Sequence, residues 1–473
     1  MRHKLVYKYI GKVLIGYSIL LIIPFLVSLL YKEFGISFLL SGLISLLIGI
    51  LLNSIKIDND IMYARDGFRI VTLSWIIISL IGAIPICILG NVSIVDGIFE
   101  AVSGFTTTGA TIFDKVEQLP KCLLFWRDFM HFIGGMGVLA FVMTIVPLSK
   151  HDKSMHLLKA EMPGPSVSKL APSIKKTLYY LYGIYFILTI SEVVLLLISG
   201  MPLFDSILIS MGTAGTGGFS PLNTSLATYG MPSQIIVTIF MFLFGVNFNI
   251  FFLLIIRDFK SIFKSEELKV YTLLYLVTVL VLVLSSLNTF TFLGDNILNA
   301  FFNASSFMSS TGFSIGNVNI YPTFARVWVL FMMVVSSCAG STCGGFKVAR
   351  LVLVFKIVKR DIQKLIHPNL VKVITFEGKR VEENILDSTK SFMFLYVLLM
   401  LLIFFIISFD NLSFEMSINA VFTSFANVGL YFEIPSFNIF SPLSKIVMSI
   451  GMLLGRLEIY PIIVLLTSWL KDN

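Results

Sequence analysis

The chain has 473 residues, of which 56% are hydrophobic and only 13% are charged. A soluble domain of this length cannot bury so much apolar surface, so the composition predicts an integral membrane protein. The apolar runs suit helices of roughly 20 residues rather than the short alternating strands of a membrane β-barrel, and the predicted fold is therefore all-α.

We expect ten transmembrane helices. The basic N-terminal stretch precedes an apolar run that is too long for a signal peptide, so it is interpreted as a retained first helix with its N-terminus inside. In chain order the spans cover residues 12–31, 36–55, 69–90, 123–147, 177–200, 233–256, 270–293, 325–355, 391–409 and 442–470.

The positive charges define an orientation for these spans. Alternating spans place 28 of the 35 Lys and Arg on the inside, with both termini there. This asymmetry follows the positive-inside rule. It also explains the net charge of +8 without a nucleic-acid partner, because solvated loops and contact with membrane lipid account for a basic inner face.

Four outward segments are too apolar for ordinary loops and too short to cross the membrane. Each ends in small polar residues and a Gly, which is typical of a re-entrant half-helix. With Gly109, Gly217, Gly312 and Gly429 in register, the chain shows an internal repeat of about one hundred residues. The segments are 96–111, 204–220, 299–314 and 414–433.

The repeat divides the chain into an N-terminal two-helix addition and four pore repeats. Four helix, half-helix, helix units around one axis form a central pore, because non-helical backbone at membrane depth is tolerated only where it lines a cavity. The predicted boundaries are 1–58 for the addition and 59–160, 161–265, 266–365 and 366–473 for the repeats.

Backbone carbonyls at the ends of the half-helices are the predicted selectivity filter. A Gly lets carbonyls turn toward the axis, where they can replace the hydration shell of a monovalent cation. The C-terminal ends of the half-helices add negative dipole at the same place. The candidates are Thr106, Thr107, Thr108, Gly109, Gly215, Thr216, Gly217, Ser310, Thr311, Gly312, Asn427, Val428 and Gly429.

Acidic residues in or near the outward segments are expected to concentrate cations at the pore mouth. Asp96 and Asp205 are also placed to cap half-helices. The set is Asp96, Glu100, Asp114, Glu117, Asp205, Asp295, Glu415 and Glu433.

A Gly- and Ser-rich stretch, 336–350, interrupts the eighth span and is predicted to be a movable gate. Lys347 would present a positive charge that repels the permeating ion. The alternative is that the small residues only allow close helix packing, with Lys347 and Arg350 marking the helix end. The gate candidates are Ala339, Gly340, Ser341, Thr342, Gly344, Gly345 and Lys347.

Other classes of protein fit these features less well. A transporter of organic solutes usually has inverted repeats, whereas these four share one orientation. A membrane enzyme needs convergent catalytic groups, and we find no such motif and no nucleotide or structural metal motif. We therefore expect no enzymatic activity and no organic cofactor, and we keep a sodium- or proton-coupled transporter of another cation or small solute as the alternative.

Ordered motifs along the whole chain resemble the Trk/Ktr/HKT superfamily of potassium transporters. Two additional N-terminal helices, the MPGP loop and the HPNLVKV loop make the chain similar to the bacterial TrkH/TrkG branch of this superfamily. Besides the half-helices, the motifs are WRDFMHFIGGMG (126–137), MPGPSVSKLAP (162–172), GVNFNIFF (245–252), AGSTCGGFKVAR (339–350), HPNLVKVITFEGKRV (367–381) and MLLGRLEIYP (452–461).

The resemblance implies K⁺ as the transported ion, bound by filter backbone oxygens, and a multi-pass protein of the bacterial inner membrane. Gly109 in place of Ser favours potassium over sodium. Arg456 is expected near the ion path, with Glu458 as a candidate partner. A homodimer and a cytosolic ring of nucleotide-binding (TrkA-like) regulatory subunits are also implied, docked on the basic loops 148–176 and 356–390.

The sequence departs from the family pattern in the fourth filter, which is NVGLYFE where many Trk-type members have N-x-G-P-G, and in the gate, with Cys338 and Cys343. His131 is interpreted as a packed, hydrogen-bonded residue rather than a proton-sensitive group. Glu192, Asn247 and Asn249 must find polar partners or water inside the membrane.

Overall fold

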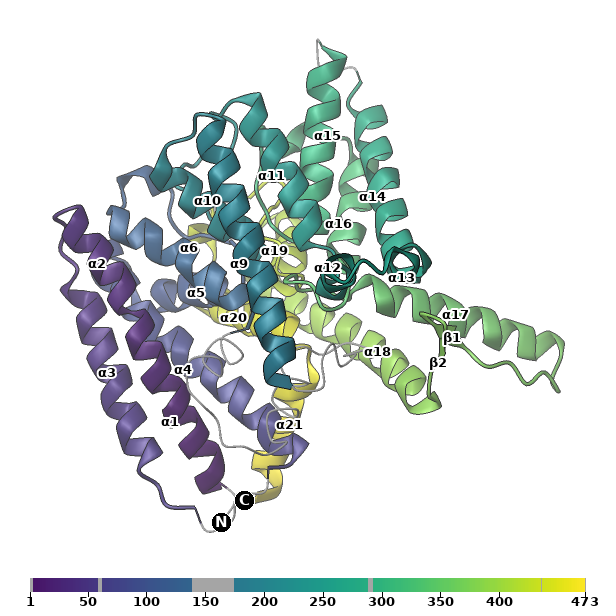
Figure 1. Cartoon of the computed structure of the whole chain (residues 1–473), viewed down its shortest axis with the longest axis horizontal. Coiled ribbons are helices and arrows are strands. Elements are labelled where there is room, and N and C mark those ends of the chain that lie inside the picture. Colours follow the sequence, from purple (N-terminus) through teal and green to yellow (C-terminus); the bar gives the residue numbers. More distant parts are fainter. Residues whose placement is uncertain (1–2, 58–61, 138–173, 288–291, 435, 473) are drawn as a thin grey trace.

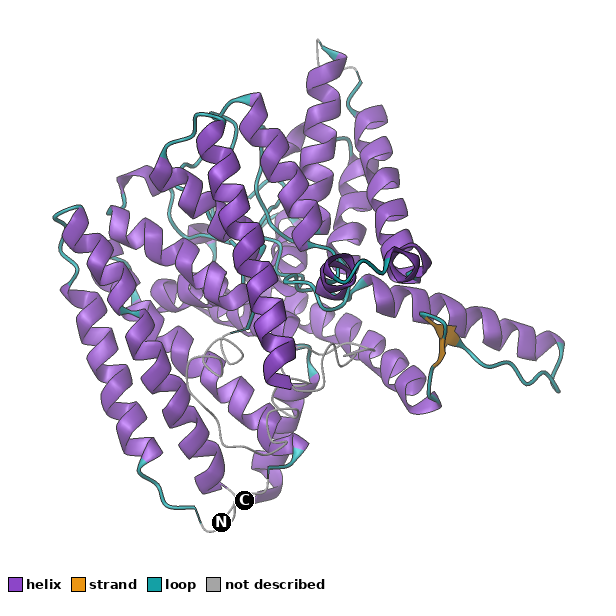
Figure 2. Cartoon of the chain, viewed as in Figure 1, coloured by secondary structure: helices purple, strands orange, loops and turns teal. Residues whose placement is uncertain are grey.

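The computed structural model describes residues 3–57, 62–137, 174–287, 292–434 and 436–472. In these ranges the chain is almost entirely helical, with one two-stranded hairpin (Figure 2). Six helices are long and apolar enough to cross a membrane, and two bent pairs bring the number to eight. The predicted helical membrane fold is confirmed. Residues 138–147 of the fourth predicted span and 148–173 of the 148–176 loop lie outside the described residues.

Three helices form the N-terminal addition: α1 (His3–Leu20), α2 (Ile22–Leu30) and α3 (Ile36–Asn53). The first predicted span consists of α1 and α2, and α3 lies beside α1 (Figure 1). Glycines allow the backbones of these two helices to approach closely. A Cβ on Gly11 would lie only 2.7 Å from the carbonyl oxygen of Gly49. The Glu33 carboxylate then accepts the backbone N–H groups of Lys121 and Cys122, both at 2.8 Å, which attaches the addition to the first repeat.

Each of the four repeats contains a long helix, a half-helix and a second helix. The first has α4 (Ala64–Gly90), α5 (Ile94–Phe105) and α6 (Lys121–Gly135); the second α9 (Ile174–Ile198), α10 (Leu203–Gly215), α11 (Met231–Phe244) and α12 (Phe248–Ile255); the third α14 (Glu266–Ser285), α15 (Leu293–Met308), α16 (Thr323–Val335) and α17 (Val348–Ile366); the fourth α18 (Glu383–Ile407), α19 (Phe414–Phe425), α20 (Pro442–Leu457) and α21 (Tyr460–Asp472).

Shorter elements connect these helices. They are α13 (Phe259–Lys264), the 3₁₀ turns η1 (Val116–Gln118), η2 (Val318–Ile320), η3 (Ser408–Asp410) and η4 (Phe437–Ile439), and the strands β1 (Thr375–Phe376) and β2 (Lys379–Arg380). The strands pair antiparallel near α17 and α18, whose far ends project as an arm from the bundle (Figure 1). This small hairpin was not part of the all-α prediction.

Within the described residues the second helix is interrupted in the second, third and fourth repeats, whereas the sequence predicted a break only in the third. The chain turns by 94° between α11 and α12 and by 112° between α20 and α21. Asn247 starts α12 by accepting the backbone N–H of Asn249 at 2.9 Å. Glu458 ends α20 with a left-handed φ of 57°. The eighth predicted span is two helices, α16 and α17, joined by the loop 336–347.

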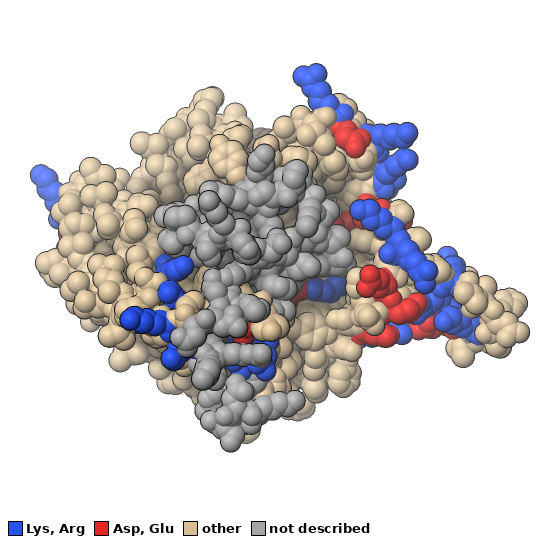
Figure 3. Space-filling model, turned by 60° about the horizontal axis from the view of Figure 1, so that its bottom comes forward, with Lys and Arg blue, Asp and Glu red and all other residues tan. Residues whose placement is uncertain are grey.

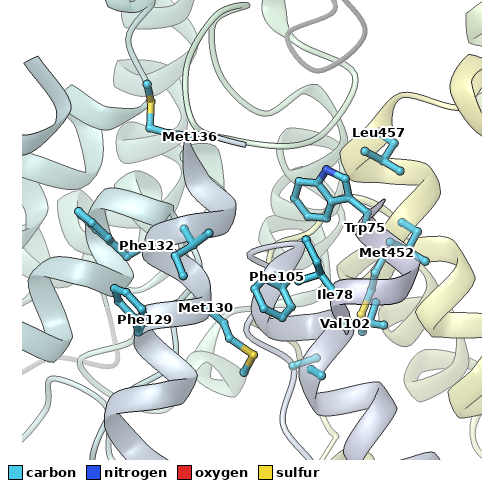
Figure 4. Packing of buried hydrophobic residues seen from close by; sticks show 14 of the residues in the cluster. Trp75, Ile78, Val102, Phe105, Phe129, Met130, Phe132, Met136, Met452 and Leu457 are labelled. Carbon is cyan, nitrogen blue, oxygen red and sulfur yellow. The ribbon is translucent and has the colours of Figure 1, made fainter. Parts of the chain in front are cut away.

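All four half-helices carry an acidic residue in their first turn, where it faces the positive end of the helix dipole: Asp96, Asp205, Asp295 and Glu415. Aromatic packing holds the first half-helix in place. Phe105, at the end of α5, makes an edge contact with Trp126 at 5.9 Å between ring centroids. Figure 4 shows Phe105 and Val102 among side chains from α4, α6 and α20. The end of α5 is therefore fixed by helices from the first and fourth repeats.

Candidate functional site: the ring at the half-helix ends

Each half-helix ends in the same backbone turn. A backbone N–H beyond the helix donates to the carbonyl five residues earlier, which satisfies a carbonyl left free by the helix end. The four bonds are Thr108 to Ser103 (2.8 Å), Gly217 to Gly212 (2.9 Å), Thr311 to Ser306 (2.9 Å) and Val428 to Thr423 (3.0 Å). Their common geometry places the four segments in register.

Left-handed backbone recurs at two positions of each segment. The first is a polar residue: Thr107, Thr216, Ser310 and Asn427, with φ between 52° and 57°. Two residues later comes a Gly: Gly109, Gly218, Gly312 and Gly429, with φ between 73° and 86°. An L side chain rarely adopts such angles, which explains the Gly.

This register corrects the sequence alignment in the second repeat. The residue equivalent to Gly109 is Gly218, and Gly217 is equivalent to Thr108. Sequence alone could not decide, because two glycines follow Thr216 and either completes the pattern of small polar residues and Gly. The helix α10 extends to Gly215 and delays the turn by one residue.

The four glycines close a ring. Each faces a carbonyl oxygen of the next repeat so closely that a Cβ would overlap it. The distances from such a Cβ are 1.9 Å for Gly109 to Gly217 O, 2.0 Å for Gly218 to Thr311 O, 2.2 Å for Gly312 to Val428 O and 2.0 Å for Gly429 to Thr108 O. The chain order of the repeats is thus their order around the ring, with the fourth beside the first.

Hydroxyl and amide side chains of the ring segments form hydrogen bonds with one another. The hydroxyls of Thr106 and Thr108 lie 2.8 Å apart, and those of Ser309 and Thr311 lie 2.6 Å apart. Asn427 Nδ2 donates to Thr108 Oγ1 at 2.9 Å and joins the fourth repeat to the first. The hydroxyls named here are therefore paired within the protein, whereas Thr107 Oγ1 and Asn427 Oδ1 are buried without a hydrogen-bond partner in the described structure.

Several acidic residues predicted for the mouth have protein partners. Glu100 is fully buried and pairs with Arg127 Nε at 2.8 Å. Asp96 pairs with Lys445 at 2.6 Å. Glu415 and Glu433 both pair with Arg326 Nη1, at 2.6 and 3.0 Å. The segment after Gly429, which departs from the family pattern, therefore contributes Glu433 to the pair of carboxylates around Arg326.

The loop 336–347 lies directly against the ring. Ser336 Oγ is 2.8 Å from Ser310 Oγ, and a Cβ on Gly344 would lie 2.8 Å from Asn427 Oδ1. Both ends of the loop hold non-Gly residues at positive φ, Ser336 (58°) and Lys347 (70°). Such conformations persist only where surrounding contacts enforce them.

Two neighbouring elements and the loop itself supply those contacts. Ala339 N donates to Glu267 Oε1 of α14 at 2.6 Å. At the α11–α12 bend, Cys338 N donates to Gly245 O and Phe248 N donates to Gly340 O, both at 3.1 Å. The buried Lys347 ammonium folds back and donates to Cys343 O at 2.6 Å. The loop is thus an ordered, anchored element.

Arg456 joins the loop to the first repeat. Its guanidinium donates to the carbonyls of Gly134 (2.6 Å) and Gly135 (2.7 Å) at the end of α6, and to Thr342 O in the loop. The candidate partner Glu458 instead pairs with Arg350 of α17. Sequence reasoning gave Arg350 no role beyond the helix end.

A cavity of about 50 Å³ lies between these groups. Its walls include Gly135, Gly344, Lys347, Arg456 and Glu458. The volume accommodates only a few water molecules. Two of its wall residues, Lys347 and Arg456, carry positive charge, and one, Glu458, carries negative charge.

The structure places three polar residues that sequence reasoning missed or left without a named partner. Glu267 was not singled out, and its neighbour Asn247 lacked a named partner; Asn247 Nδ2 donates to Glu267 Oε2 at 3.4 Å. Glu192 is fully buried on α9 and faces Thr213 of α10. Only the position of Glu267 in the first turn of an apolar helix could have pointed to it.

Four half-helices that converge on a ring of backbone carbonyls are characteristic of membrane proteins that conduct ions. The sequence model of the TrkH cation transport protein family matches residues 36–471, and the chain belongs to this family. It is 33% identical to the Trk system potassium uptake protein TrkG of Escherichia coli over 96% of this chain and 95% of that protein. It is 32% identical to TrkH of Salmonella typhimurium over 99% of both chains. The crystal structure of the potassium transporter TrkH from Vibrio parahaemolyticus superposes with a TM-score of 0.89 at 28% identity, covering 98% of this chain and 99% of that one.

Proposed function

We propose that this chain takes up K⁺ across a bacterial inner membrane through a pore at the centre of its four repeats. The observation that carries the proposal is the closed ring, in which each Gly faces a carbonyl oxygen of the next repeat. The two relatives named above are potassium uptake proteins by name, and this chain matches them over nearly their whole length. Both facts support the choice of ion.

In this proposal the ring segments form the selectivity filter, with K⁺ held by backbone carbonyls. The filter comprises Thr106 to Gly109, Gly215 to Gly218, Ser310 to Gly312 and Asn427 to Gly429. Four half-helix ends converge there, and their partial negative charge favours a cation. Carbonyls fixed by the same turn in every repeat discriminate between ions by the number and spacing of their oxygens.

The loop 336–347 is the gate in this proposal, and the structure corresponds to its closed state. Lys347 and Arg456 repel a cation at the small cavity, which is lined from this loop by Gly340, Ser341, Cys343, Gly344, Gly345 and Lys347. Opening requires the loop to leave the contacts with Glu267, Arg456 and the α11–α12 bend. The strain at Ser336 and Lys347 lowers the energy needed for that step.

The chain would act as a homodimer with a cytosolic ring of nucleotide-binding subunits, with both termini in the cytoplasm. The distribution of Lys and Arg supports this orientation. The arm formed by α17, the hairpin and α18 presents exposed basic residues to such a partner (Figure 3): Lys359, Lys364, Lys372, Lys379, Arg380 and Lys390. The hairpin contacts α14, since the Glu377 carboxylate accepts the backbone N–H of Glu267 at 3.0 Å. Because Glu267 also holds Ala339 of the loop, a partner bound to the arm can influence the gate through this residue.

The test is cation flux into liposomes that contain the purified chain and internal K⁺. Uptake of Rb⁺, Na⁺ and Li⁺ is compared with and without a proton gradient, and with and without the cytosolic partner. Selective Rb⁺ uptake is expected, and its dependence on the proton gradient distinguishes coupled transport from passive flow. Absence of selective flux with the partner present would contradict the proposal and favour transport of another solute.

A further inference from the structure

The four ring segments are equivalent in backbone but are held by different side chains just beyond the ring Gly. In the third and fourth repeats the tie is a hydroxyl of the half-helix itself. Ser306 Oγ donates to Phe313 O at 2.6 Å, and Thr423 Oγ1 donates to Leu430 O at 3.1 Å. Ser306 and Thr423 occupy equivalent positions, since the backbone carbonyl of each also accepts the N–H of the turn described above.

The first repeat uses a carboxylate for the same purpose. Glu100, on α5, accepts Ile112 N and Thr111 Oγ1, both at 3.0 Å. The Arg127 guanidinium donates to this carboxylate and also to Thr111 Oγ1, the latter at 3.0 Å. The segment that follows Gly109 is thus fixed by α5, the half-helix of the same repeat, as the corresponding segments are in the third and fourth repeats.

The second repeat has Gly212 where the others have Ser103, Ser306 and Thr423, and therefore has no side chain at this position. A Cβ on Gly212 would lie 2.9 Å from Phe313 Cζ, which leaves little room for a hydroxyl group. The tie comes instead from α6 of the neighbouring repeat. His131 Nε2 accepts the backbone N–H of Phe219 at 3.3 Å.

The other ring nitrogen of His131 contacts the first repeat. Nδ1 lies 2.7 Å from the carbonyl oxygen of Gly104 on α5. Because Phe219 N–H can only donate, Nε2 must be the unprotonated nitrogen, and Nδ1 carries the hydrogen that bonds Gly104 O. A neutral imidazole with its hydrogen on Nδ1 therefore joins Gly104 of the first half-helix to Phe219 in the ring segment of the second repeat.

Packing leaves this ring no freedom. His131 stacks on Phe219 at 4.2 Å, and the Arg127 guanidinium lies 4.0 Å from the centroid of the same Phe219 ring. A Cβ on Gly217 would lie 2.3 Å from the imidazole. Gly217 supplies the carbonyl that faces Gly109, so the imidazole lies directly behind one oxygen position of the ring.

We propose that His131 is a positioning residue for ion selectivity. Its Nε2 holds Phe219 of the second repeat by accepting the backbone N–H, whereas in the third and fourth repeats a hydroxyl holds the equivalent residue by donating to its carbonyl oxygen. This inference rests on the proposed function. Loss of the tie frees the strand 217–219, lets the Gly217 carbonyl move and allows the ring to adapt to the smaller Na⁺. Total flux is less affected than selectivity, since three quarters of the ring keep their ties.

The test uses two amide variants of His131 that separate its two hydrogen bonds. In His131→Gln the amide oxygen reaches about the place of Nε2 and can accept Phe219 N–H. In His131→Asn the amide lies near the place of Nδ1 and cannot. We expect His131→Asn to lower the Rb⁺ over Na⁺ flux ratio about fivefold, the effect of one lost hydrogen bond, and His131→Gln to stay within about twofold of wild type.

An unchanged ratio in His131→Asn, or an equal loss in both variants, would overturn the inference. A wild-type protein without Rb⁺ preference would instead contradict the proposed function. The ¹⁵N chemical shifts of histidine in the full-length wild-type protein in lipid test the tautomer directly, with the His131 signal assigned by isotope labelling of His131–Phe132, the one His–Phe pair in the sequence. Protonated Nδ1 with unprotonated Nε2 is expected, and an Nε2–H or doubly protonated ring would overturn the inference even if the variants fail to fold.

Discussion

The Cα of Gly429 faces the carbonyl oxygen of Thr108 so closely that a Cβ on Gly429 would lie 2.0 Å from that oxygen. This contact closes the ring between the last repeat and the first. Asn427 strengthens the same seam through its bonds to Thr108 Oγ1 and to Met452 O, both at 2.9 Å. A single chain thus completes the ring without a second subunit.

Gly109→Ser is expected to lower the preference for Rb⁺ over Na⁺ by about tenfold, or about 1.4 kcal/mol. The new Cβ would lie 1.9 Å from Gly217 O, and Ser is unfavourable at the φ of 81° that Gly109 adopts. Competitive flux in liposomes measures the ratio. Gly183→Ser is the control, because a Cβ there meets no atom within 4 Å. An unchanged ratio in Gly109→Ser would remove Gly109 from the filter.

Arg456→Gln is expected to raise Rb⁺ flux in the absence of the cytosolic partner by about tenfold. The substitution weakens charge-assisted bonds to Gly134 O, Gly135 O and Thr342 O, each worth about 1.5–3 kcal/mol. Lys269→Gln, which removes an exposed charge from α14, serves as control. Equal flux from Arg456→Gln and wild type would show that this latch does not hold the gate shut.

Glu267→Gln is expected to increase basal flux by about fivefold, because the Ala339 N–H loses its charged acceptor. The neighbouring Glu266→Gln is the matched control. Glu266 pairs at 2.5 Å with Lys356 near the surface, a contact worth about 0–1 kcal/mol. If both variants behave alike, the anchoring of the gate by α14 is wrong.

Glu100→Gln is expected to destabilise the protein by about 3–5 kcal/mol, since it leaves the buried Arg127 guanidinium without its counter-charge. The thermal unfolding midpoint in detergent should fall by roughly 5 °C or more. The double variant Glu100→Met/Arg127→Met should recover part of this loss, because an apolar pair replaces an ion pair at similar volume. A single variant as stable as wild type would show that water or another group compensates Arg127.

The half-helices, the four-repeat pattern and the interruption after α16 were all predictable from the sequence. Each depends on a local signal: an apolar run of limited length, a recurring small-polar and Gly ending, or a cluster such as CAGSTCGG. The one-residue shift at Gly218 was not predictable, because Thr-Gly-Gly fits two registers and the length of α10 decides between them.

Long-range partners were also beyond the sequence. Lys445 pairs with Asp96, and Arg350 pairs with Glu458, across different repeats. Such pairs depend on how the repeats are arranged around the axis rather than on spacing along the chain. The bends at Gly245 and Glu458 were missed because the flanking residues remain apolar, so hydropathy continues smoothly through the turn.

The unequal ties behind the ring have a genetic consequence. In a pore assembled from four identical subunits, one codon change appears in every quadrant, and the ion meets the altered group four times. Here a hydroxyl, a carboxylate and an imidazole are encoded at separate places, so one mutation alters a single quadrant. Selection can therefore adjust ion preference in quarter steps and retain variants that a symmetric pore would not survive.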